Sequence, residues 1–487
     1  MIDDSYNNDL SGLRISLDFL AGQHQKKRKI LILSDILQSG LEDSLLVTRI
    51  AELVNNSGID KVVGIGKQLQ QHAGFFTMPS QFFADTDAFL HAIRRDDFHD
   101  AVILLKGARR FRFEKILAVL QRKVHGTVME INLDAMVHNL NYIRSLLLPS
   151  TKMMVMVKAF AYGSGSAEVA NLLQYHKVDY LGVAYADEGI ELRKHNITLP
   201  VLVMNPSAES FASIQHYHLE PEIYSFRILH ALIDFLKGEK IKIHLKIDTG
   251  MHRLGFDAGQ LEELTRLLAA TPNLHVASVF SHLSGADDQA HDDFTKSQAQ
   301  QFMRIAESIA GAIGYKPLFH ILNSPGLLRH TQWQLDMVRL GIGLYGIDPT
   351  SGQHPLKPVA TLKTVVSQIK EIAAGETIGY GRKGKADAHM RTATIALGYA
   401  DGFGRVFSNG VGKVLVNGKL APVVGNVCMD MTMVDVSGID VQEGDEVVIF
   451  GDELPIADVA QWANTIPYEI LTNTSERVKR VFVAESI

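Results

Sequence analysis

The sequence predicts an α/β protein of three domains, and three changes of pattern along the chain support this prediction. Apolar strands alternate with amphipathic helices up to about residue 124, the alternation restarts at Thr127, and short strands with glycine turns follow Pro358. A chain of 487 residues is long enough for about two to four domains. We expect a small three-layer α/β domain at 1–124, a larger α/β domain at 125–358 and an antiparallel β domain at 359–487.

The first of these domains contains β-rich runs separated by amphipathic segments. The runs are KILILSD (29–35), KVVGIG (61–66) and DAVILLKG (100–107). Strands that alternate with helices in this way are typical of βαβ units with a parallel sheet. Gly64, Gly66 and Lys67 lack the third glycine of a dinucleotide fingerprint and the spacing of a P-loop, so they predict a turn.

The second domain repeats strand and helix over more than 200 residues. TVMEINLDAMVHNL indicates a strand and a helix, and the later apolar runs are MMVMVK, DYLGVA, PVLVM, IKIHLKIDTG and VASVFSHLS. This repetition fits either a doubly wound parallel sheet or an eight-stranded barrel, and the pattern alone does not choose.

The third domain has a different sequence pattern. TLKTVVSQIKEI, TATIALGYADG, GKVLVNGKLAPVVG, MTMVDV and DEVVIFG are short alternating strands with turns that contain glycine. Such strands favour an antiparallel β domain.

Composition excludes several classes of function. The net charge is −6 with both signs interspersed, so no basic stripe predicts nucleic-acid binding, and a small polar ligand is favoured. The chain has no apolar run long enough to span a membrane, its first residues lack the features of a signal peptide, and Cys428 is its one cysteine. We therefore expect a cytoplasmic protein. His282, Asp287, Asp288, His291, Asp292 and Asp293 lack metal-ligand spacing, which predicts a helix start and no metal.

Lys158 is the first candidate for chemistry. It ends the apolar run MMVMVK and precedes a small-residue loop that contains Tyr162. Barrel enzymes keep their active sites at the carboxyl ends of the strands, and lysine is the residue that forms Schiff bases. Taken alone, a lysine at a strand end is more often a solvated terminus than a nucleophile.

Six motifs favour the nucleophile over the solvated strand end for Lys158, because they resemble those of alanine racemases in that family's order. They are VKAFAYGSGS, HLKIDTGMHRLGF, MVRLGIGLYG, GYADGFGR, VGNVCMDMTMVDV and IPYEI, and the resemblance runs from about Thr127 to the C-terminus. It implies a fold-type III pyridoxal-phosphate enzyme with a (β/α)8 barrel and a C-terminal β domain, which favours the barrel over the doubly wound sheet. It also implies interconversion of L- and D-alanine, which supplies peptidoglycan precursors.

The resemblance also implies roles for individual residues. Lys158 would carry pyridoxal 5'-phosphate covalently. Arg339 would hydrogen-bond the pyridine nitrogen of the cofactor without protonating it, because a guanidinium only donates. The phosphate would be held by Tyr162, Ser324, Gly341, Ile342 and Tyr468.

Racemisation needs a proton donor and acceptor on each face of the α-carbon. Tyr380 matches the family's second base, which enters the site from the other subunit, so the resemblance implies a homodimer with shared active sites. His282 would link this tyrosine to Arg339.

Four further residues match the substrate side of the family's site. Arg253 would bind the substrate carboxylate, and Tyr399 and Met429 would restrict the pocket to a small side chain. Lys246 matches a lysine that is carbamylated in many members, and an unmodified lysine beside Asp248 is the alternative.

The chain departs from the family motifs at three positions. Phe160 and Ser164 stand where many members have asparagine and histidine, and His252 replaces a common glycine. None of these positions is a proposed acid or base. Activity on serine remains open.

The first 124 residues carry a second resemblance. DDSYNND (3–9), ILSDIL (32–37) and LLKGARRFRFEKI (104–116) are similar to the C-terminal domain of UDP-N-acetylmuramoyl-tripeptide–D-alanyl-D-alanine ligase. No G-x-x-x-x-G-K-[ST] loop is present, so we expect no ligation by this chain alone. The role of this segment, and whether the chain is a fragment of a longer bifunctional protein, stay open.

Three other functions compete with the racemase. A related pyridoxal-phosphate decarboxylase would not be expected to carry GYADG and VCMDMTMVDV in this form. A cofactor carrier of similar barrel type would lack the β domain. A ligase or an interaction module would depend on the first 124 residues only.

Overall fold

The computed structural model describes residues 2–4, 9–23, 26–37, 40–98, 100–120, 126–350 and 352–484. The chain divides into two compact units, Met1–Asp134 with Pro358–Ile487, and Ala135–Lys357. The expected domain boundary at residue 124 lies outside the described residues, as does the Ser5–Asn8 part of the DDSYNND motif. In the described ranges, no helix combines the length and the apolar character needed to cross a membrane.

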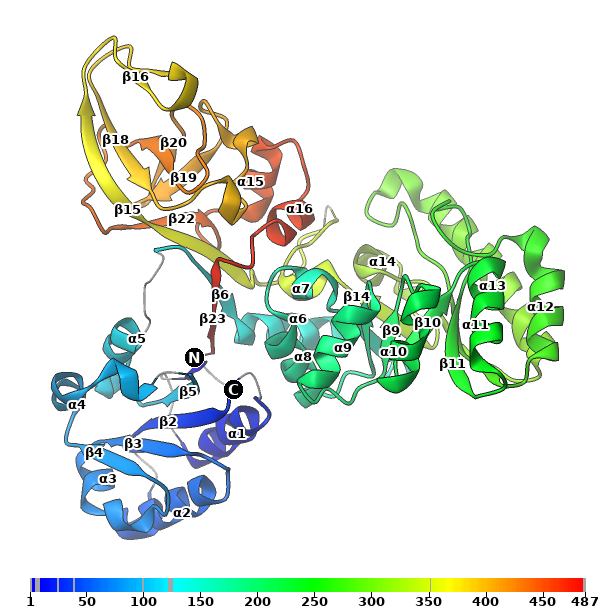
Figure 1. The fold of residues 1–487 in the computed structure, drawn as a ribbon, viewed down its shortest axis with the longest axis horizontal. Helices are drawn as coiled ribbons and strands as arrows, with labels where there is room; N and C mark the ends of the chain where they lie inside the picture. The colour runs from blue at the N-terminus through cyan, green and yellow to red at the C-terminus, as the bar shows by residue number, and fades with distance from the viewer. Residues whose placement is uncertain are drawn as a thin grey trace. The chain divides into compact units, whose positions relative to one another are not determined.

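The N-terminal domain contains a parallel sheet in the order β1-β5-β2-β3-β4 (Figure 1, blue). Its strands are β1 (Ile2–Asp4), β2 (Arg28–Ser34), β3 (Lys61–Ile65), β4 (Ser80–Phe83) and β5 (Ala101–Lys106). Its helices are α1 (Leu10–Ala21), α2 (Asp43–Asn55), α3 (Lys67–Gln71), α4 (Thr86–Ala92) and α5 (Glu114–Leu120).

Both faces of this sheet are buried. Ile30 and Ile32 of β2 pack in one cluster with Phe89 of α4 and Ile116 of α5. The alternate residues of β2 are also fully buried, and they point to the opposite face, where α1 packs on β5 and on α2. Helices therefore cover both faces, and the predicted three-layer α/β arrangement is confirmed.

Polar side chains fix the carboxyl ends of these strands. Lys106 Nζ at the end of β5 lies 2.6 Å from Asp4 Oδ2 at the end of β1, and both side chains are buried. The carboxylate of Asp35, in the ILSDIL motif, accepts hydrogen bonds from the backbone of α3. Gly66 has φ +136°, and a Cβ there would lie 2.2 Å from Asp35, so the expected turn at this glycine is present.

The β domain is antiparallel apart from one pair of strands. Its strands are β6 (Val128–Asn132), β15 (Ala360–Ile372), β16 (Thr377–Ile378), β17 (Gly384–Lys385), β18 (Met390–Ile395), β19 (Lys413–Val416), β20 (Lys419–Pro422), β21 (Thr432–Asp435), β22 (Glu446–Phe450) and β23 (Lys479–Val483). Helices α15 (Ile456–Trp462) and α16 (Pro467–Thr472) complete it. β6 pairs with β15 and, in parallel, with β23, and it has no partner among the barrel strands. β23 also pairs with β1.

The second unit is a barrel of eight parallel strands in the order β13-β12-β11-β10-β9-β8-β7-β14. They are β7 (Lys152–Met156), β8 (Tyr180–Val183), β9 (Val201–Val203), β10 (Glu220–Ile223), β11 (Ile241–Lys246), β12 (Leu274–Phe280), β13 (Leu318–His320) and β14 (Met337–Leu340). Backbone bonds from Asp336 N to Phe319 O and from Arg339 N to Leu322 O, both 3.1 Å, join the last two strands. The (β/α)8 barrel is thus confirmed over the doubly wound sheet.

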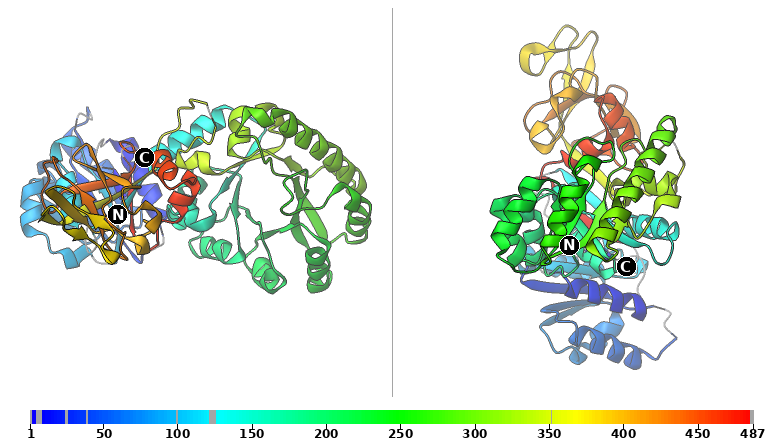
Figure 2. Two further views of the ribbon diagram at one scale, coloured as in Figure 1. Left: turned by 90° about the horizontal axis from the view of Figure 1, so that it is seen from above. Right: turned by 90° about the vertical axis from the view of Figure 1, so that its right-hand side faces the viewer.

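Helices lie on the outer side of the ring of strands (Figure 2, left). The helices of this unit are α6 (Leu133–Ser145), α8 (Ser166–Tyr175), α9 (Ala186–Lys194), α10 (Phe211–His216), α11 (Phe226–Leu236), α12 (Leu261–Ala270), α13 (Asp292–Ile313) and α14 (Ser324–Arg329). The segment α7 (Lys158–Tyr162) is a left-handed turn directly after β7. In β10 and β11 polar residues alternate with apolar ones, and Glu220, Glu222, His244 and Lys246 are buried, so the polar face of these strands is turned into the barrel.

Candidate active site

The carboxyl ends of parallel barrel strands meet at one end of the barrel, where loops can bring side chains together. Lys158 lies just after β7, Lys246 ends β11, and His282 follows β12. The structure gathers nine of the predicted residues at this end: Lys158, Tyr162, Lys246, Arg253, His282, Ser324, Arg339, Gly341 and Ile342.

Lys158 is half-buried and electrostatically perturbed. Burial lowers the pKa of its amine, and the positive charge of Arg253 lowers it further, against the carboxylates of Glu188 and Glu222. Glu188 also fixes the adjoining backbone, because it accepts from Ala159 N and from Ala184 N, each at 2.6 Å. A lysine with a lowered pKa is available as a free amine nearer neutral pH, which nucleophilic and base chemistry requires.

The turn after Lys158 is left-handed. Ala159, Phe160, Ala161 and Tyr162 have φ of 52°, 55°, 51° and 53°. Each such residue costs about 1–2 kcal/mol, so the surrounding structure must hold the turn. Asparagine tolerates this conformation better than phenylalanine, which explains why the family's asparagine suits position 160. The turn leaves the ring of Tyr162 4.7 Å from that of Tyr345.

A cluster of polar donors lies beside Tyr162. Ser324 Oγ accepts from Gly341 N at 2.9 Å and from Gly343 N at 3.2 Å. A Cβ on Gly341 would lie 3.0 Å from Tyr162 Oη and 3.6 Å from Ser324 Oγ, so the missing side chain leaves room between the two hydroxyls. Two hydroxyls beside such a space fit a phosphate group, and the amides of Gly341 and Gly343 hold the Ser324 hydroxyl in place.

Arg339 is buried, and both terminal nitrogens of its guanidinium make hydrogen bonds. Nη2 donates to Ser281 O at 2.6 Å and to Ile321 O at 3.1 Å, and Nη1 lies 2.6 Å from His320 Nδ1. Among the described residues, no acceptor lies at its Nε–H. One N–H donor of a fixed guanidinium fits a pyridine nitrogen, which is an acceptor only.

His282 lies between Arg339 and Asn323. Its Nδ1 is 3.4 Å from Arg339 Nη2, and its Nε2 is 3.4 Å from Asn323 Nδ2. Burial and the charge of Arg339 hold its pKa well below the ordinary value, so the ring is neutral. A neutral imidazole has one acceptor nitrogen, so only one of these two contacts is a hydrogen bond.

Lys246 and Glu222 are buried within electrostatic reach of each other. Burial lowers the pKa of Lys246 and raises that of Glu222, and each group opposes the shift of the other. Lys246 Nζ lies 4.6 Å from the centre of the Phe280 ring. Arg253 is exposed and lies within electrostatic reach of both groups.

The loop after β11 explains one departure from the family. His252 has φ +54°, a conformation that glycine adopts without strain. Asp248 compensates, since its Oδ1 accepts from the backbone of Gly250, Met251 and His252 at 2.9–3.1 Å. Ser164 is the buried one of the three departures, and its Oγ has no hydrogen-bond partner among the described residues.

Four predicted residues lie in the β domain. Tyr380 is 73% exposed, between two glycines of positive φ, and its backbone carbonyl accepts from Asn426 Nδ2 at 2.9 Å. Tyr399 and Met429 are also exposed. Tyr468 belongs to α16.

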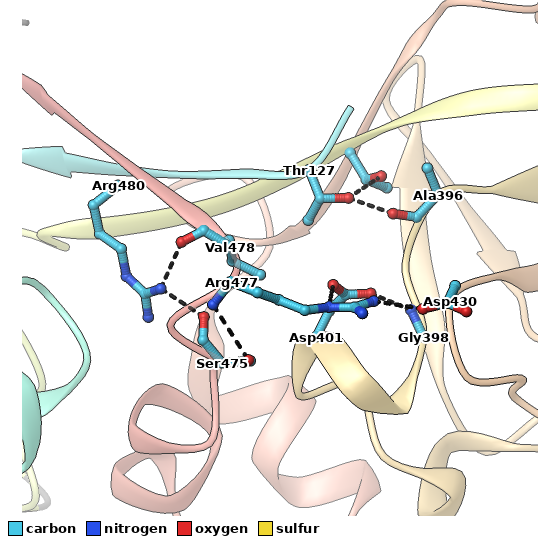
Figure 3. Close-up of polar contacts among 10 residues, drawn as sticks. Thr127, Ala396, Gly398, Asp401, Asp430, Ser475, Arg477, Val478 and Arg480 are labelled. Carbon is cyan, nitrogen blue, oxygen red and sulfur yellow. Dashed lines mark hydrogen bonds and ion pairs between the residues drawn. The ribbon is translucent and has the colours of Figure 1, made fainter. Parts of the chain in front are cut away.

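Arg477 joins the two motifs that carry Tyr399 and Met429 (Figure 3). Its Nε lies 2.7 Å from Asp401 Oδ1, and its Nη2 lies 2.8 Å from Asp430 Oδ1. Tyr399 N donates to Cys428 O at 3.0 Å. The structure therefore brings GYADG and VCMDM together on one side of the β domain.

Apart from His282, the cluster of His and Asp residues after β12 takes no part in the site. α13 begins at Asp292, which pairs with Arg329 at 2.8 Å, and Asp288 caps the preceding turn. In the part of the chain that the structure describes, no three His, Cys, Asp or Glu residues are grouped as metal ligands would be.

Three residues near the site were missed by sequence reasoning: Glu188, Glu222 and His320. His320 ends a strand whose other residues are apolar, and Glu222 alternates with apolar residues in β10. A charged or imidazole side chain in such a strand, close to its carboxyl end, is the signal that could have found them.

Comparison with known proteins agrees with this geometry. The family model "Alanine racemase, N-terminal domain" matches residues 131–349, and "Alanine racemase, C-terminal domain" matches residues 359–482. The alanine racemase of Clostridium kluyveri is 37% identical over 368 residues, which cover 73% of this chain and 93% of that protein. The alanine racemase of Helicobacter pylori is 36% identical over 375 residues, 74% of this chain and 99% of that one.

Solved structures give the same result. An alanine racemase from Clostridium difficile superposes with a TM-score of 0.70 at 36% identity and covers 74% of this chain and 97% of its own. The alanine racemase of Bacillus anthracis with bound L-Ala-P gives 0.69 at 30% identity and covers 74% and 95%. The chain therefore belongs to the alanine racemase family.

Proposed function

We propose that this chain interconverts L- and D-alanine by removing the Cα proton on one face and returning it on the other, with Lys158 and Tyr380 as the two bases. Its D-alanine would supply peptidoglycan precursors. The observation that carries the proposal is a lysine of lowered pKa at the mouth of the same barrel as a phosphate-sized set of donors. Membership of the alanine racemase family supports it.

Pyridoxal 5'-phosphate, the cofactor of this family, accepts the electron pair that proton removal leaves on Cα. Lys158 would hold it covalently, and Arg339 Nε–H would donate to its ring nitrogen. Ser324 Oγ, Tyr162 Oη, the backbone of Gly341 and Ile342, and Tyr468 would hold its phosphate. Because a guanidinium donates without releasing a proton, Arg339 would leave the ring nitrogen neutral.

Two bases are needed because one group cannot reach both faces of a planar carbon. The lowered pKa of Lys158 suits it to accept and return a proton on one face. Tyr380 would serve the other face. His282, if its Nδ1 accepts from Arg339, carries its proton on Nε2 and would donate it to the oxygen of Tyr380.

Tyr380 would come from a second copy of the chain, so that the active unit is a homodimer in the cytoplasm. The side chain is 73% exposed on the β domain and is held between two flexible glycines, which suits a residue that reaches a neighbouring chain.

Arg253 would pair with the substrate carboxylate, and Tyr399 and Met429 would limit the side chain to a methyl group. Lys246 would be carbamylated: its free amine attacks CO2, a proton leaves, and the resulting anion pairs with Arg253. Burial supports this, because it lowers the pKa of Lys246 and so increases the free amine. Intact-protein mass before and after mild acid treatment would test the modification.

We divide the chain into a ligase-like domain at 1–124, a cofactor-binding barrel segment at 125–358, whose first strand β6 joins the sheet of the β domain, and a racemase β domain at 359–487. The ligase-like domain would be catalytically silent. ATP-dependent ligation by the purified chain would contradict this role.

Substituting Tyr380 with phenylalanine tests the two-base proposal. Tyr380→Phe should still bind the cofactor but should lose exchange of the α-proton of L-alanine with deuterated water. Tyr175→Phe, on the exposed side of α8, is the matched control and should keep full activity. Undiminished turnover of Tyr380→Phe in both directions would refute the second base.

Mixing two inactive variants tests the shared site. In a dimer of one Lys158→Ala chain and one Tyr380→Phe chain, one of the two sites would have both bases intact. Random pairing should restore roughly a quarter of the native activity. If each chain supplies its own Tyr380, mixing restores none.

A further inference from the structure

A row of buried polar side chains crosses five neighbouring strands of the barrel. Arg339 Nη1 lies 2.6 Å from His320 Nδ1, and His320 Nε2 lies 2.9 Å from Ser278 Oγ. Ser278 Oγ lies 2.6 Å from His244 Nδ1, and His244 Nε2 lies 2.8 Å from Glu220 Oε2. Each of the five residues is at least 90% buried, so water does not replace these partners.

With both rings neutral, only one arrangement of protons satisfies every contact. Arg339 can only donate, so His320 must accept at Nδ1 and, as a neutral ring, carry its proton on Nε2. Ser278 then accepts from His320 and has its single hydroxyl proton left for His244 Nδ1. His244 therefore carries its proton on Nε2 and donates it to Glu220, which can only accept.

The electrostatics of this row agree with a neutral ring at His320. Burial, and then the charge of Arg339, hold the pKa of His320 well below its ordinary value. Burial alone would raise the pKa of Glu220, but the hydrogen bond from His244 and the charge of Lys242 lower it overall. Glu220 is thus an anion at one end of the row, and Arg339 is a cation at the other.

We propose that Glu220, His244, Ser278 and His320 form a one-directional hydrogen-bond chain that fixes the guanidinium of Arg339. They are positioning residues for the reaction, since Arg339 alone would touch the cofactor, and in this respect the inference rests on the proposed function. If His320 took the other tautomer, its Nδ1–H would face a guanidinium N–H at 2.6 Å, and Arg339 would move.

A tautomer measurement tests the chain directly in the apoprotein. Long-range proton–nitrogen correlation of ¹⁵N-histidine-labelled protein reports which ring nitrogen carries the proton, and His244→Asn and His320→Asn assign the two signals. Both rings should be neutral and protonated on Nε2. A proton on Nδ1 of either ring, or a charged ring at neutral pH, would overturn the proposal. This readout does not depend on racemase activity.

Variants of Glu220, at the far end of the hydrogen-bond chain, distinguish a positioning role from a packing role. Glu220→Leu removes the acceptor, whereas Glu220→Gln keeps an oxygen in its place. Glu220→Leu should let His244 and His320 sample both tautomers and should lower kcat by about tenfold or more with KM little changed. Glu220→Gln should restore both properties, because only an acceptor is required.

Two further variants complete the design. Lys242→Ala is the control: it removes an exposed cation 3.5 Å from Glu220 Oε1 and should alter neither tautomers nor kcat. Ser278→Ala breaks the hydrogen-bond chain in its middle with a small change, so it replaces Glu220→Leu if that variant does not fold.

Two outcomes would contradict the hydrogen-bond chain. One is unchanged histidine tautomers in whichever of these two variants folds, and the other is an equal loss of kcat in Glu220→Gln and Glu220→Leu. Loss of racemisation by the unmodified protein, with the tautomers as stated, would refute the proposed function alone.

Discussion

Replacing Gly341 with alanine should weaken cofactor binding only by disturbing the contacts to the cofactor phosphate. The added methyl group would lie 3.0 Å from Tyr162 Oη and 3.6 Å from Ser324 Oγ, between the hydroxyls assigned to the phosphate. Tyr162 cannot easily withdraw, because its ring packs on Tyr345, which donates to Met156 O at 3.1 Å. The methyl group would therefore occupy space that a phosphate oxygen needs.

The expected loss can be worked out from one displaced contact. A hydrogen bond to a charged group contributes about 1.5–3 kcal/mol. Since about 1.4 kcal/mol corresponds to a factor of ten, losing one such bond should raise the Kd roughly 10- to 150-fold.

Titration of the apoprotein with two ligands measures this effect. Pyridoxal 5'-phosphate should bind Gly341→Ala more weakly by that factor, whereas pyridoxal, which lacks the phosphate, should bind both proteins equally. Gly311→Ala in α13 is the matched control, because its Cβ would meet nothing within 4 Å. The reasoning is refuted if Gly341→Ala leaves the Kd of pyridoxal 5'-phosphate unchanged, or weakens both ligands alike.

Two further predictions concern charge. Because Arg253 lowers the pKa of Lys158 from the ordinary 10.5, Arg253→Gln should move the pH midpoint of cofactor uptake by the apoprotein upward; a downward shift would contradict this. Asp4→Asn leaves the buried charge of Lys106 unpaired and should lower the unfolding free energy of the N-terminal domain by about 3–5 kcal/mol. Asp87→Asn, in an exposed ion pair, should cost about 1 kcal/mol or less in the same urea titration; equal losses would refute the argument.

The sequence predicted which segments alternate between strand and helix, but the local pattern did not predict that the strands close into a barrel. Strand and helix runs have the same local pattern in a barrel and in a doubly wound sheet, so only the motifs favoured the barrel. Closure depends on pairing of β7 with β14, whose residues lie far apart along the chain. In the same way, the local pattern of Val128–Asn132 predicts a strand but not its partners, which belong to the β domain.

The site was predictable where a motif marked it and unpredictable inside the strands. Lys158 and Arg339 stand in recognisable motifs. Glu220, Glu222 and His244 alternate with apolar residues, a pattern that also fits a strand with one face in water. In the closed barrel that polar face is turned inward, so its side chains meet one another instead of solvent, and no local pattern encodes this.

The most direct test of the central claim is to reduce the cofactor-loaded protein with borohydride and map the labelled peptide. The account predicts one pyridoxyl group on Lys158. A label on Lys246 or another lysine, or a protein that takes up no cofactor, would contradict it.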